Sequence, residues 1–507
     1  DATFARQQEI GIVRAGVPLP EHPPWMPRWS TLSADERRVY ARMMEVYAGF
    51  LAHTDHQIGR LMAFLRDRDL LDDTLVLLLS DNGASAEGGP RGSHNEHRFT
   101  HDMLDDPAEL AARAHELGGH RAYNHYAWGW AWAGNTPFRL WKRFAWLGGV
   151  RTPLIAHWPR GIAARGEVRP QFCHAVDLLP TILDAAGIDA PKIVDGVPQQ
   201  RIDGASLKRT FDDAQAPDPR PTQYFEMMGS RALWHQGWKV TTDHVGRQLT
   251  VEREQVPGSS EFDDDHWALF RLDDDPAEAN DVGARHPDVL RRMIDLWWAE
   301  AGSNQVLPLD DGFLTRAVAI EPSPWGFRCR ADLVAGGGPV CETLLPAMGG
   351  GFRLVMDVIV PESGAAGVLV AIGDWHNGWA TYVIDGRPAL ALSLFGDVLR
   401  VAADDPLAPG ARRIEVLYRR AREGGGPIAI GVDGRIVARG VVPGDLPFRW
   451  QIGGTGLLVG RDRGFPVCDD YRPPAPFTGT ITSAVLESLG VLPRDVQEEI
   501  KALLRRE

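Results

Sequence analysis

Two adjacent side chains with oxygen donors follow an apolar run in the first quarter of the chain. The run at residues 74–80 (TLVLLLS) leads directly into Asp81, Asn82 and Gly83. A carboxylate and an amide oxygen are hard ligands of the kind that suits Ca²⁺ or Mg²⁺. Gly83 lets the chain turn sharply, so that both side chains can face one site. The same three residues also form an ordinary turn, and the local sequence leaves both interpretations open.

The elements before this loop are predicted to be a long helix and a buried strand. Ser33 and Glu36 have capping-box spacing, in which each side chain bonds an N–H group of the first turn. Apolar residues then recur at helical spacing and predict one buried face: Tyr40, Met43, Met44, Tyr47, Leu51, Ile58, Leu61 and Leu65. The unbroken run at 74–80 is typical of a strand covered on both faces in a mostly parallel sheet. Ligands of such sheets lie at the strands' carboxyl ends, where Asp81 stands.

The chain is predicted to fold as a partial α/β core followed by two smaller parts. Residues 1–32 are rich in proline and are expected to be extended. Another strand and helix are expected at 150–157 and 175–186, which places the core at residues 1–218. Short alternating segments and one helix at 219–305 predict a small antiparallel sheet with a helix packed on it.

The last part of the chain has the pattern of an all-β domain. From 310 to 507, short β-branched or alternating segments are separated by Gly, Pro and Asp. The pairs at 385–386 and 433–434 are Asp-Gly, a strong hairpin signal. We therefore expect a β-sandwich of the concanavalin or jelly-roll kind at 310–507.

Composition excludes several classes of function. The formal net charge of −14 argues against nucleic-acid binding, which needs a basic face. No apolar stretch approaches the roughly 18 residues of a membrane helix. The four cysteines show no CxxC spacing, so they predict no zinc site, and a bridge between Cys329 and Cys341 or free thiols remain alternatives. The sequence does not distinguish a cytoplasmic from a periplasmic or secreted protein.

Several segments resemble the type I (formylglycine-dependent) sulfatases in order and spacing. These are VYAGFLAHTDHQIGRL (46–61), LDDTLVLLLSDNGASAEGG (71–89) and GNTPFRLWKRFAWLGGVRTPLIAHWP (134–159). The family's small C-terminal subdomain is similar to YFEMMGSRALWHQGWK (224–239) and LFRLDDDPAEANDV (269–282). The extra sandwich of long bacterial arylsulfatases is similar to NGWATYVIDGRP (377–388) and YRPPAPFTGTI (471–481). The resemblance implies an alkaline-phosphatase-like sulfatase core that lacks its N-terminal half, and a small-molecule or glycan sulfate ester as substrate.

The resemblance assigns roles to three residues. Asp81 and Asn82 match the family's C-terminal pair of Ca²⁺ ligands, with Mg²⁺ the less favoured cation. Lys142, in TPFRLWK, matches the lysine that binds the sulfate group. A metal and an ammonium would stabilise the negative charge that develops on the ester oxygens. The alternative for Lys142 is a solvated surface lysine, but its bulky neighbours favour an enclosed one.

The stretch at 85–135 is expected to shape the substrate entrance, because loops at strand ends carry specificity. Candidates for lining it are Asn124, His125, Trp128 and Trp130, although packing explains the aromatic residues at 123–132 slightly better. Six histidines of this stretch lack the spacing of a zinc site and are expected to be exposed loop residues: His94, His97, His101, His115, His120 and His125.

The chain shows no nucleophile signature of the family. The formylglycine is made from the first residue of a C/S-x-P-x-R motif, and no cysteine here stands in one. The family's N-terminal Asp pair and its upstream Lys and His residues also lack counterparts. Two ligands cannot hold a hard cation that needs six or more oxygens. We therefore expect formylglycine only in a missing N-terminal part, and no sulfatase activity and weak or no Ca²⁺ binding in this chain alone.

Three other functions remain open at this point. A phosphatase, phosphodiesterase or phosphonate hydrolase would share the fold and metal chemistry, although Lys142 and the following GGVRTP favour a sulfatase. The β domain would bind carbohydrate if Trp375, His376 and Trp379 formed a stacking platform, whereas packing is the favoured explanation of these residues. A nonfunctional remnant is the third alternative.

Overall fold

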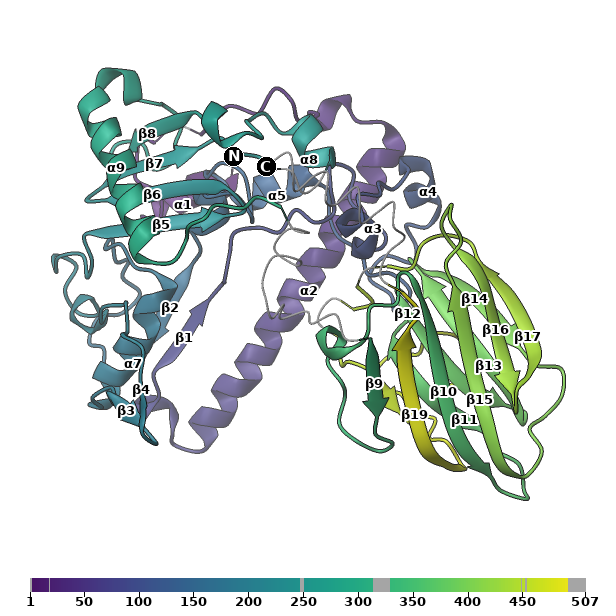
Figure 1. Cartoon of the computed structure of the whole chain (residues 1–507). Helices are drawn as coiled ribbons and strands as arrows, with labels where there is room; N and C mark the ends of the chain where they lie inside the picture. The colour runs from purple at the N-terminus through teal and green to yellow at the C-terminus, as the bar shows by residue number, and fades with distance from the viewer. Residues whose placement is uncertain are drawn as a thin grey trace. The chain divides into compact units, whose positions relative to one another are not determined.

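The computed structural model describes residues 2–17, 19–246, 250–312, 329–447, 449–451 and 454–490 (Figure 1). The chain divides into two compact units. The first unit holds Asp1–Gly92 and Tyr126–Gly312, and the second holds Ser93–His125 and Phe313–Glu507. The domain boundaries predicted from the sequence, 1–218, 219–305 and 310–507, stay predictions. Within the described ranges, none of the helices combines the length and apolar composition that crossing a membrane requires.

The N-terminal segment is partly helical, so the prediction of an extended segment at 1–32 was wrong at its start. Helix α1 covers Ala2–Glu9, a run without β-branched residues apart from Thr3. Phe4 anchors this helix in a small apolar cluster with Val13, Val17 and Ala277. Burial of a few apolar side chains thus outweighs the proline-rich composition of the segment that follows.

Helix α2, Ala34–Asp67, is the predicted long helix, and Ser33 caps it as expected (Figure 1). The Ser33 hydroxyl accepts from the Glu36 backbone N–H at 3.2 Å, and the Ser33 N–H donates to the Glu36 carboxylate at 2.8 Å. The predicted buried face is confirmed only over the first turns, where Val39, Tyr40 and Met43 are buried. Further along, apolar side chains are exposed, by 65% at Phe50, 53% at Leu51 and 56% at Leu61.

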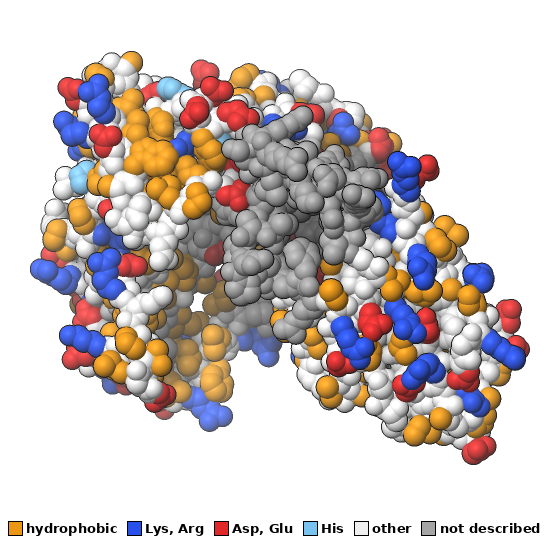
Figure 2. Space-filling model, viewed as in Figure 1, with side chains coloured by type: hydrophobic (Ala, Val, Ile, Leu, Met, Phe, Trp, Pro, Cys, Tyr) orange, Lys and Arg blue, Asp and Glu red, His pale blue; other side chains and the backbone are white. Residues whose placement is uncertain are grey.

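Strands β1, Val76–Leu79, and β2, Leu154–His157, form a two-stranded sheet. They pair antiparallel, so the prediction of a mostly parallel sheet that buries residues 74–80 on both faces was wrong. No third described strand extends either edge of this sheet, and Leu78, Leu79 and Ile155 are therefore 43%, 40% and 55% exposed. Hydrophobic side chains reach the surface of this unit in Figure 2. Burial of an apolar run on both faces requires neighbouring strands and covering layers. In this two-stranded sheet, residues 74–77 are half-buried and residues 78–80 are exposed.

A four-stranded antiparallel sheet and a helix form the second layer of the first unit. The strand order is β5-β6-β7-β8, with β5 at Thr222–Met227, β6 at Ser230–His235, β7 at Trp238–Thr242 and β8 at Trp267–Arg271. Helix α9, Pro287–Ser303, packs on the sheet through a core that contains Leu233, Val240, Leu269, Met293 and Trp297. The predicted sheet and helix are confirmed. Strands β6 and β7 form a hairpin, in which Ala232–His235 pairs with Trp238–Thr241.

The remaining elements of the first unit are short. They are α5 (Trp128–Gly134), α6 (Leu147–Val150), α7 (Leu178–Ala186), α8 (Thr250–Gln255), β3 (Ile193–Val194) and β4 (Val197–Pro198). Helix α7 matches the helix predicted at 175–186, and Gly187, at φ +68°, ends it in the left-handed conformation.

The second unit contains two antiparallel sheets that share one hydrophobic core, as the sequence predicts. The first sheet has the order β17-β16-β15-β10-β19-β9 and the second β14-β13-β12-β11-β18. The strands are β9 (Arg330–Leu333), β10 (Gly351–Val360), β11 (Gly367–Gly373), β12 (Gly378–Ile384), β13 (Arg387–Leu394), β14 (Asp397–Ala402), β15 (Gly410–Arg419), β16 (Gly426–Val432), β17 (Arg435–Val442), β18 (Leu458–Val459) and β19 (Thr480–Ser488). Leu354 and Val416 of the first sheet and Ile372 and Leu392 of the second lie in this core.

Both predicted Asp-Gly hairpins are present in the sandwich. Asp385 and Gly386 join β12 to β13 with φ values of 49° and 76°, and Asp433 and Gly434 join β16 to β17 with 49° and 80°. Two consecutive positive φ values define the tight turn whose twist matches that of paired strands. Helices α3, Glu96–Thr100, and α4, Pro107–Ala112, belong to the same unit, although they come from residues 93–125.

Candidate functional site

The loop after β1 holds Asp81 and Asn82 in a hydrogen-bonded turn. The Asp81 carboxylate accepts from the Asn82 backbone N–H at 3.1 Å, and the Asn82 side-chain amide donates to the Gly83 carbonyl at 2.9 Å. The Ser80 hydroxyl donates to the Asn82 carbonyl at 3.0 Å. Asp81 is exposed and Asn82 half-buried. Two oxygen-bearing side chains therefore stand together at the end of β1, already oriented by local bonds.

Gly83 fixes this loop against the segment that leads into β2. Its N–H donates to the Gly149 carbonyl at 2.9 Å. A Cβ atom at this position would lie 1.6 Å from the Gly148 carbonyl oxygen, so only glycine fits. Gly83 was predicted to allow a sharp turn, whereas the close approach of the Gly148 backbone is what requires glycine here.

Asn135 joins the Asp81–Asn82 loop to the turn that carries Lys142. Its side-chain oxygen accepts from the Ala84 N–H at 2.9 Å. Its side-chain amide donates to the Leu140 carbonyl at 2.8 Å and to the Gly148 carbonyl at 2.9 Å. The Lys142 N–H donates to the Ala84 carbonyl at 3.0 Å. The structure therefore brings the loop and the Lys142 turn together as one cross-braced assembly, which residue spacing alone did not predict.

The Lys142 ammonium is paired with a carboxylate. Lys142 Nζ lies 2.6 Å from Glu87 Oε1, and the Lys142 side chain is 40% exposed. The turn around it is unusual, because Leu140 and Arg143 have φ values of 57° and 88°. An anion that binds Lys142 must therefore compete with the Glu87 carboxylate for the ammonium. Sequence reasoning missed Glu87, which lies 55 positions from Lys142 and has no local signal.

Arg143 anchors the other side of this turn. It forms an ion pair with Glu252, whose side chain is 5% exposed, and it donates to the Val245 carbonyl at 2.9 Å. Burial raises the pKa of Glu252, and the Arg143 guanidinium opposes that rise. The adjacent cations Lys142 and Arg143 thus contact Glu87 and Glu252, respectively. The Arg143–Glu252 pair is the more buried of the two and has a structural role.

A buried ion pair holds the backbone that follows Lys142. The Lys239 ammonium contacts the Glu278 carboxylate, with side-chain exposures of 1% and 0%. Lys239 Nζ also donates to the Ala145 carbonyl at 2.9 Å, and Glu278 Oε2 accepts from the Leu147 N–H at 2.7 Å. Desolvation lowers the pKa of Lys239, and the Glu278 carboxylate opposes this shift. The pair therefore connects the four-stranded sheet to the Lys142 segment.

The described residues do not complete a cation site around Asp81 and Asn82. No group of three or more His, Cys, Asp or Glu side chains in the described ranges is arranged to hold a metal ion. The donor chemistry of the pair fits Ca²⁺, but two side chains fall short of the six or more oxygens that the ion takes. All four cysteines, each within the described ranges, are free thiols, and Cys468 is buried.

The four entrance candidates fall into different units. Trp128 is only 2% exposed, its indole N–H donates to the Ala86 carbonyl at 2.9 Å, and its ring lies 5.2 Å from that of Trp141. Trp128 is therefore a packed core residue, which agrees with the packing explanation, and its part in an entrance stays a prediction. Trp130 is half-buried, and its indole N–H donates to the Tyr40 carbonyl at 2.9 Å. Both tryptophans belong to the first unit.

Asn124 and His125 belong to the second unit. The Asn124 side-chain oxygen accepts from the Gly118 N–H at 2.9 Å. The backbone of His125 pairs with Ser93 through two N–H···O bonds of 2.9 Å each. Both residues are half-buried, and their part in an entrance stays a prediction.

In the second unit the expectation of exposed histidines was wrong, whereas the favoured explanation of the aromatic residues at 375–379 agrees with their burial. His94 and His97 are 5% and 4% exposed rather than exposed loop residues, because the segment at 93–125 packs within this unit. Trp375, His376 and Trp379 are 8%, 7% and 0% exposed. They cannot form an open stacking platform for a sugar, and the packing explanation is the correct one.

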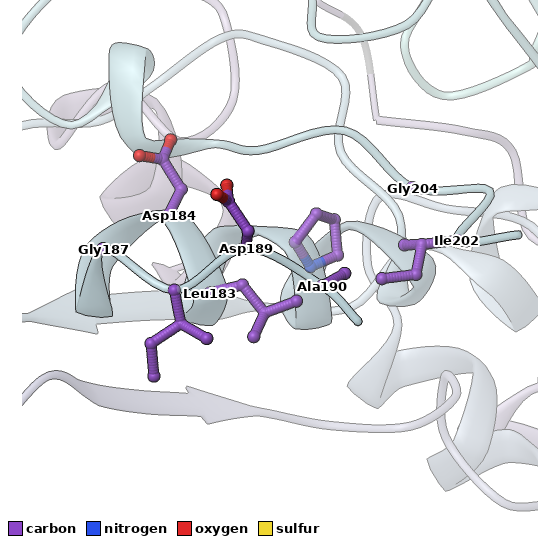
Figure 3. A pocket seen from close by; sticks show the side chains of 9 residues that line it. Leu183, Asp184, Gly187, Asp189, Ala190, Ile202 and Gly204 are labelled. Carbon is purple, nitrogen blue, oxygen red and sulfur yellow. The ribbon is translucent and has the colours of Figure 1, made fainter. Parts of the chain in front are cut away.

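A pocket beside the end of α7 does not coincide with the candidate residues (Figure 3). Its volume is about 460 Å³, and Leu183, Ile188 and Ile202 give it an apolar wall. Asp184 and Asp189 point to the same side of it in Figure 3, and Asp184 lies 3.1 Å from Lys208 Nζ. Asp81, Asn82 and Lys142 do not line this pocket, and it adds no chemistry to their assembly.

Two sulfatase family models and several known sulfatases are similar to this chain. A profile described as Sulfatase matches residues 13–188, and one described as N-sulphoglucosamine sulphohydrolase, C-terminal, matches residues 138–293. An uncharacterized sulfatase of Schizosaccharomyces pombe is 26% identical over 320 residues, 62% of this chain and 53% of that protein. The arylsulfatase of Klebsiella aerogenes is 30% identical over 206 residues, 40% of this chain and 42% of that protein. This chain thus spans about half the length of the curated relatives it matches.

Solved structures were matched more weakly. The crystal structure of Ps i-CgsB aligns with 62% of this chain and 56% of that chain, at 17% identity and a TM-score of 0.35.

Proposed function

Because the chain belongs to the sulfatase family, we propose that it carries part of an active site for the hydrolysis of sulfate esters. One observation carries the proposal: Asn135 and the backbone bond from Lys142 to Ala84 join the Asp81–Asn82 loop to the Lys142 turn. The oxygen-bearing side chains of Asp81 and Asn82 and the ammonium of Lys142 are therefore carried by two segments that are hydrogen-bonded to each other. The substrate class is a sulfate ester of a small molecule or a glycan.

Lys142 is proposed to bind the sulfate group. Sulfate-ester cleavage places negative charge on the ester and sulfate oxygens, and a fixed ammonium stabilises that charge more in the transition state than in the ground state. The sulfate must displace Glu87 from Lys142, since Glu87 Oε1 is 2.6 Å from Nζ. Asn135 and the Lys142 N–H hold the turn in place during this exchange.

Asp81 and Asn82 are proposed to supply two oxygen ligands to Ca²⁺, which would act as a Lewis acid beside the sulfate. No group of three or more His, Cys, Asp or Glu among the described residues could hold the ion, so we propose that further ligands come from outside these residues. The family's formylglycine nucleophile also has no source here, because neither a cysteine nor a serine of this sequence begins a C/S-x-P-x-R motif. We therefore propose that the 507-residue chain alone does not hydrolyse sulfate esters.

Turnover of a chromogenic aryl sulfate tests this proposal. The purified chain should give no rate above the uncatalysed background, with or without added Ca²⁺. A turnover rate that Lys142→Ala abolishes would contradict the proposed inactivity while supporting the role of Lys142. A turnover rate that persists in Lys142→Ala would contradict both the proposed inactivity and the proposed role of Lys142.

The product of the complete reading frame tests the substrate class. If that product includes an in-frame C-x-P-x-R motif, an aryl sulfate should be hydrolysed faster than the matching aryl phosphate. Faster phosphate hydrolysis would favour a phosphatase or phosphonate hydrolase of the same superfamily. A complete reading frame without the motif would favour a nonfunctional remnant.

A further inference from the structure

Three imidazoles gather where residues 93–125, here called the inserted segment, pack on the sandwich within the second unit. His97 lies in α3 and His101 directly follows it, whereas His376 lies in the turn between β11 and β12. His97 is 4% and His376 7% exposed. The Tyr123 ring lies between them, 6.0 Å from the His97 ring and 5.5 Å from the His376 ring. The Asn95 side-chain amide donates to the His376 carbonyl at 2.9 Å and ties the segment to this turn.

The hydrogen bonds of the cluster fit neutral imidazoles. His376 Nδ1 lies 2.8 Å from a carboxylate oxygen of Asp374, which can only accept, so Nδ1 carries the hydrogen. His101 Nδ1 donates in the same way to the His97 carbonyl at 2.6 Å. His376 Nε2 and His97 Nδ1 are buried and have no hydrogen-bond partner among the described residues. A proton added to either atom would create a buried donor without an acceptor.

The charges around His97 do not compensate for such a proton. The groups that act on it are His101 of its own segment, Asp374 and His376 of the turn, and Arg449 of the loop after β17. Asp374 is the single carboxylate among these four, and it already accepts from the backbone and the ring of His376. Burial lowers the pKa of His97 to about 4 and also lowers that of His101.

A further carboxylate of the same unit also loses charge on acidification. Burial raises the pKa of Asp462 to about 6, and the neighbouring Asp374 contributes to this rise. Because its native pKa is raised, protonation of Asp462 favours the folded unit as the pH falls, so this carboxylate does not contribute to release of the inserted segment.

We propose that the His97, His101 and His376 cluster is a pH-sensitive latch, which holds the inserted segment on the sandwich at neutral pH and releases it on acidification. The packed state keeps His97 and His101 neutral, whereas the released state lets water solvate their imidazolium ions. The packed state therefore binds fewer protons below the ordinary pKa of histidine, and its stability falls as the pH falls. For His97 alone, the fall in pKa from 6.5 to about 4 favours release roughly 30-fold between pH 7.5 and pH 5.

Release would also move two entrance candidates. The Ser93–His125 bonds and the Glu96 N–H···O bond to Tyr123, all of 2.9 Å, connect α3 to the strand-like end of the segment. Asn124 and His125 therefore follow α3 when it leaves the turn. This consequence for substrate access rests on the proposed function, whereas the latch itself does not.

Hydrogen–deuterium exchange of the whole chain at pH 7.5 and pH 5.0 tests the latch without any activity measurement. Rates are corrected for the intrinsic pH dependence of exchange. Because α3 and α4 have five and six residues, they do not persist without packing, and their amides exchange on release. We expect peptides covering 93–105 and 370–378 to open at least tenfold more at pH 5.0, while β10 and β15 stay protected.

Matched variants assign the response to the cluster. His97→Gln removes a titrating group and should reduce the pH response several-fold, and His101→Gln provides a second, independent reduction. His115→Gln is the control, since His115 is an exposed residue of the same segment, and it should respond as the natural chain does. An equal corrected rate at both pH values, or an unreduced response in both cluster variants, would overturn the proposal. Protection of β15 at pH 7.5 verifies that each variant is folded.

Discussion

Replacement of Gly83 by alanine probes the contact that joins the Asp81–Asn82 loop to the Lys142 segment. The added Cβ atom would lie 1.6 Å from the Gly148 oxygen and 2.7 Å from its carbonyl carbon, and both are backbone atoms that cannot rotate away. The loop must then retreat, which breaks the Gly83 bond to Gly149 and strains the Lys142 bond to Ala84. Two hydrogen bonds are worth about 1 kcal/mol each. The residual strain adds about 1–3 kcal/mol, so the expected loss is about 3–5 kcal/mol.

Urea unfolding of Gly83→Ala, followed by tryptophan fluorescence, measures this loss. Gly49→Ala is the matched control, because Gly49 lies inside α2 and an added Cβ meets nothing within 4 Å. That substitution should stabilise the chain by roughly 0.5–1 kcal/mol, since alanine loses less backbone entropy in a helix than glycine does. Opposite signs for the two glycines are expected. A loss below about 1 kcal/mol at Gly83 would refute the account of the loop contact.

Three further results follow from buried or exposed groups. Lys239→Met should cost about 3–5 kcal/mol in urea unfolding, because it leaves Glu278 buried without its cation. Adding Glu278→Gln should restore at least half of the loss. Equal stability of Lys239→Met and the natural chain would contradict this expectation. Since burial raises the pKa of Asp462 from 3.8 to about 6, the native state binds the extra proton between these values and loses stability as the pH rises through them. Asp462→Asn should therefore gain up to about 3 kcal/mol relative to the natural chain between pH 4 and pH 7, and a pH-independent difference would argue against the buried charge. Leu79 and Ile155, 40% and 55% exposed, predict binding of the dye ANS by the folded chain, which Leu79→Lys with Ile155→Lys should reduce; unchanged fluorescence would place the dye elsewhere.

Features that depend on neighbouring residues could be predicted from the sequence. The Ser33–Glu36 capping box, the Asp-Gly turns at 385–386 and 433–434 and the amphipathic helix α9 each need only a few adjacent positions. The physics of capping, positive φ and helical periodicity acts over that range. These features are present in the structure as expected.

Features that depend on distant partners could not be predicted in the same way. The pairing of β1 with β2 joins residues about 75 positions apart, and the apolar run at 74–80 specifies no direction for its partner. The inserted segment belongs to the sandwich unit because Asn95 and His97 meet a turn some 280 positions away. Its histidines therefore looked like exposed loop residues. Burial is a property of the assembled fold and leaves no local signal here.

The candidate site shows the same division. Asp81 and Asn82 were identified from their residue types, and Lys142 from the resemblance to a family. Asn135 and Glu87 were missed, because their importance lies in which backbone groups and side chains they reach. Both residues stand within segments that resemble the family, at 71–89 and 134–159, so these segments held the available signal.

The role of Lys142 in sulfate-ester hydrolysis is tested most directly by two lysine variants of the complete reading-frame product. In a product that carries the C-x-P-x-R motif, Lys142→Ala should lower kcat/KM for an aryl sulfate by about 10²–10³-fold, the usual effect of removing one charge-stabilising donor. Lys208→Ala is the control, since Lys208 pairs with Asp184 beside α7 and should leave kcat/KM unchanged. An equal kcat/KM for Lys142→Ala and the natural enzyme would contradict the account.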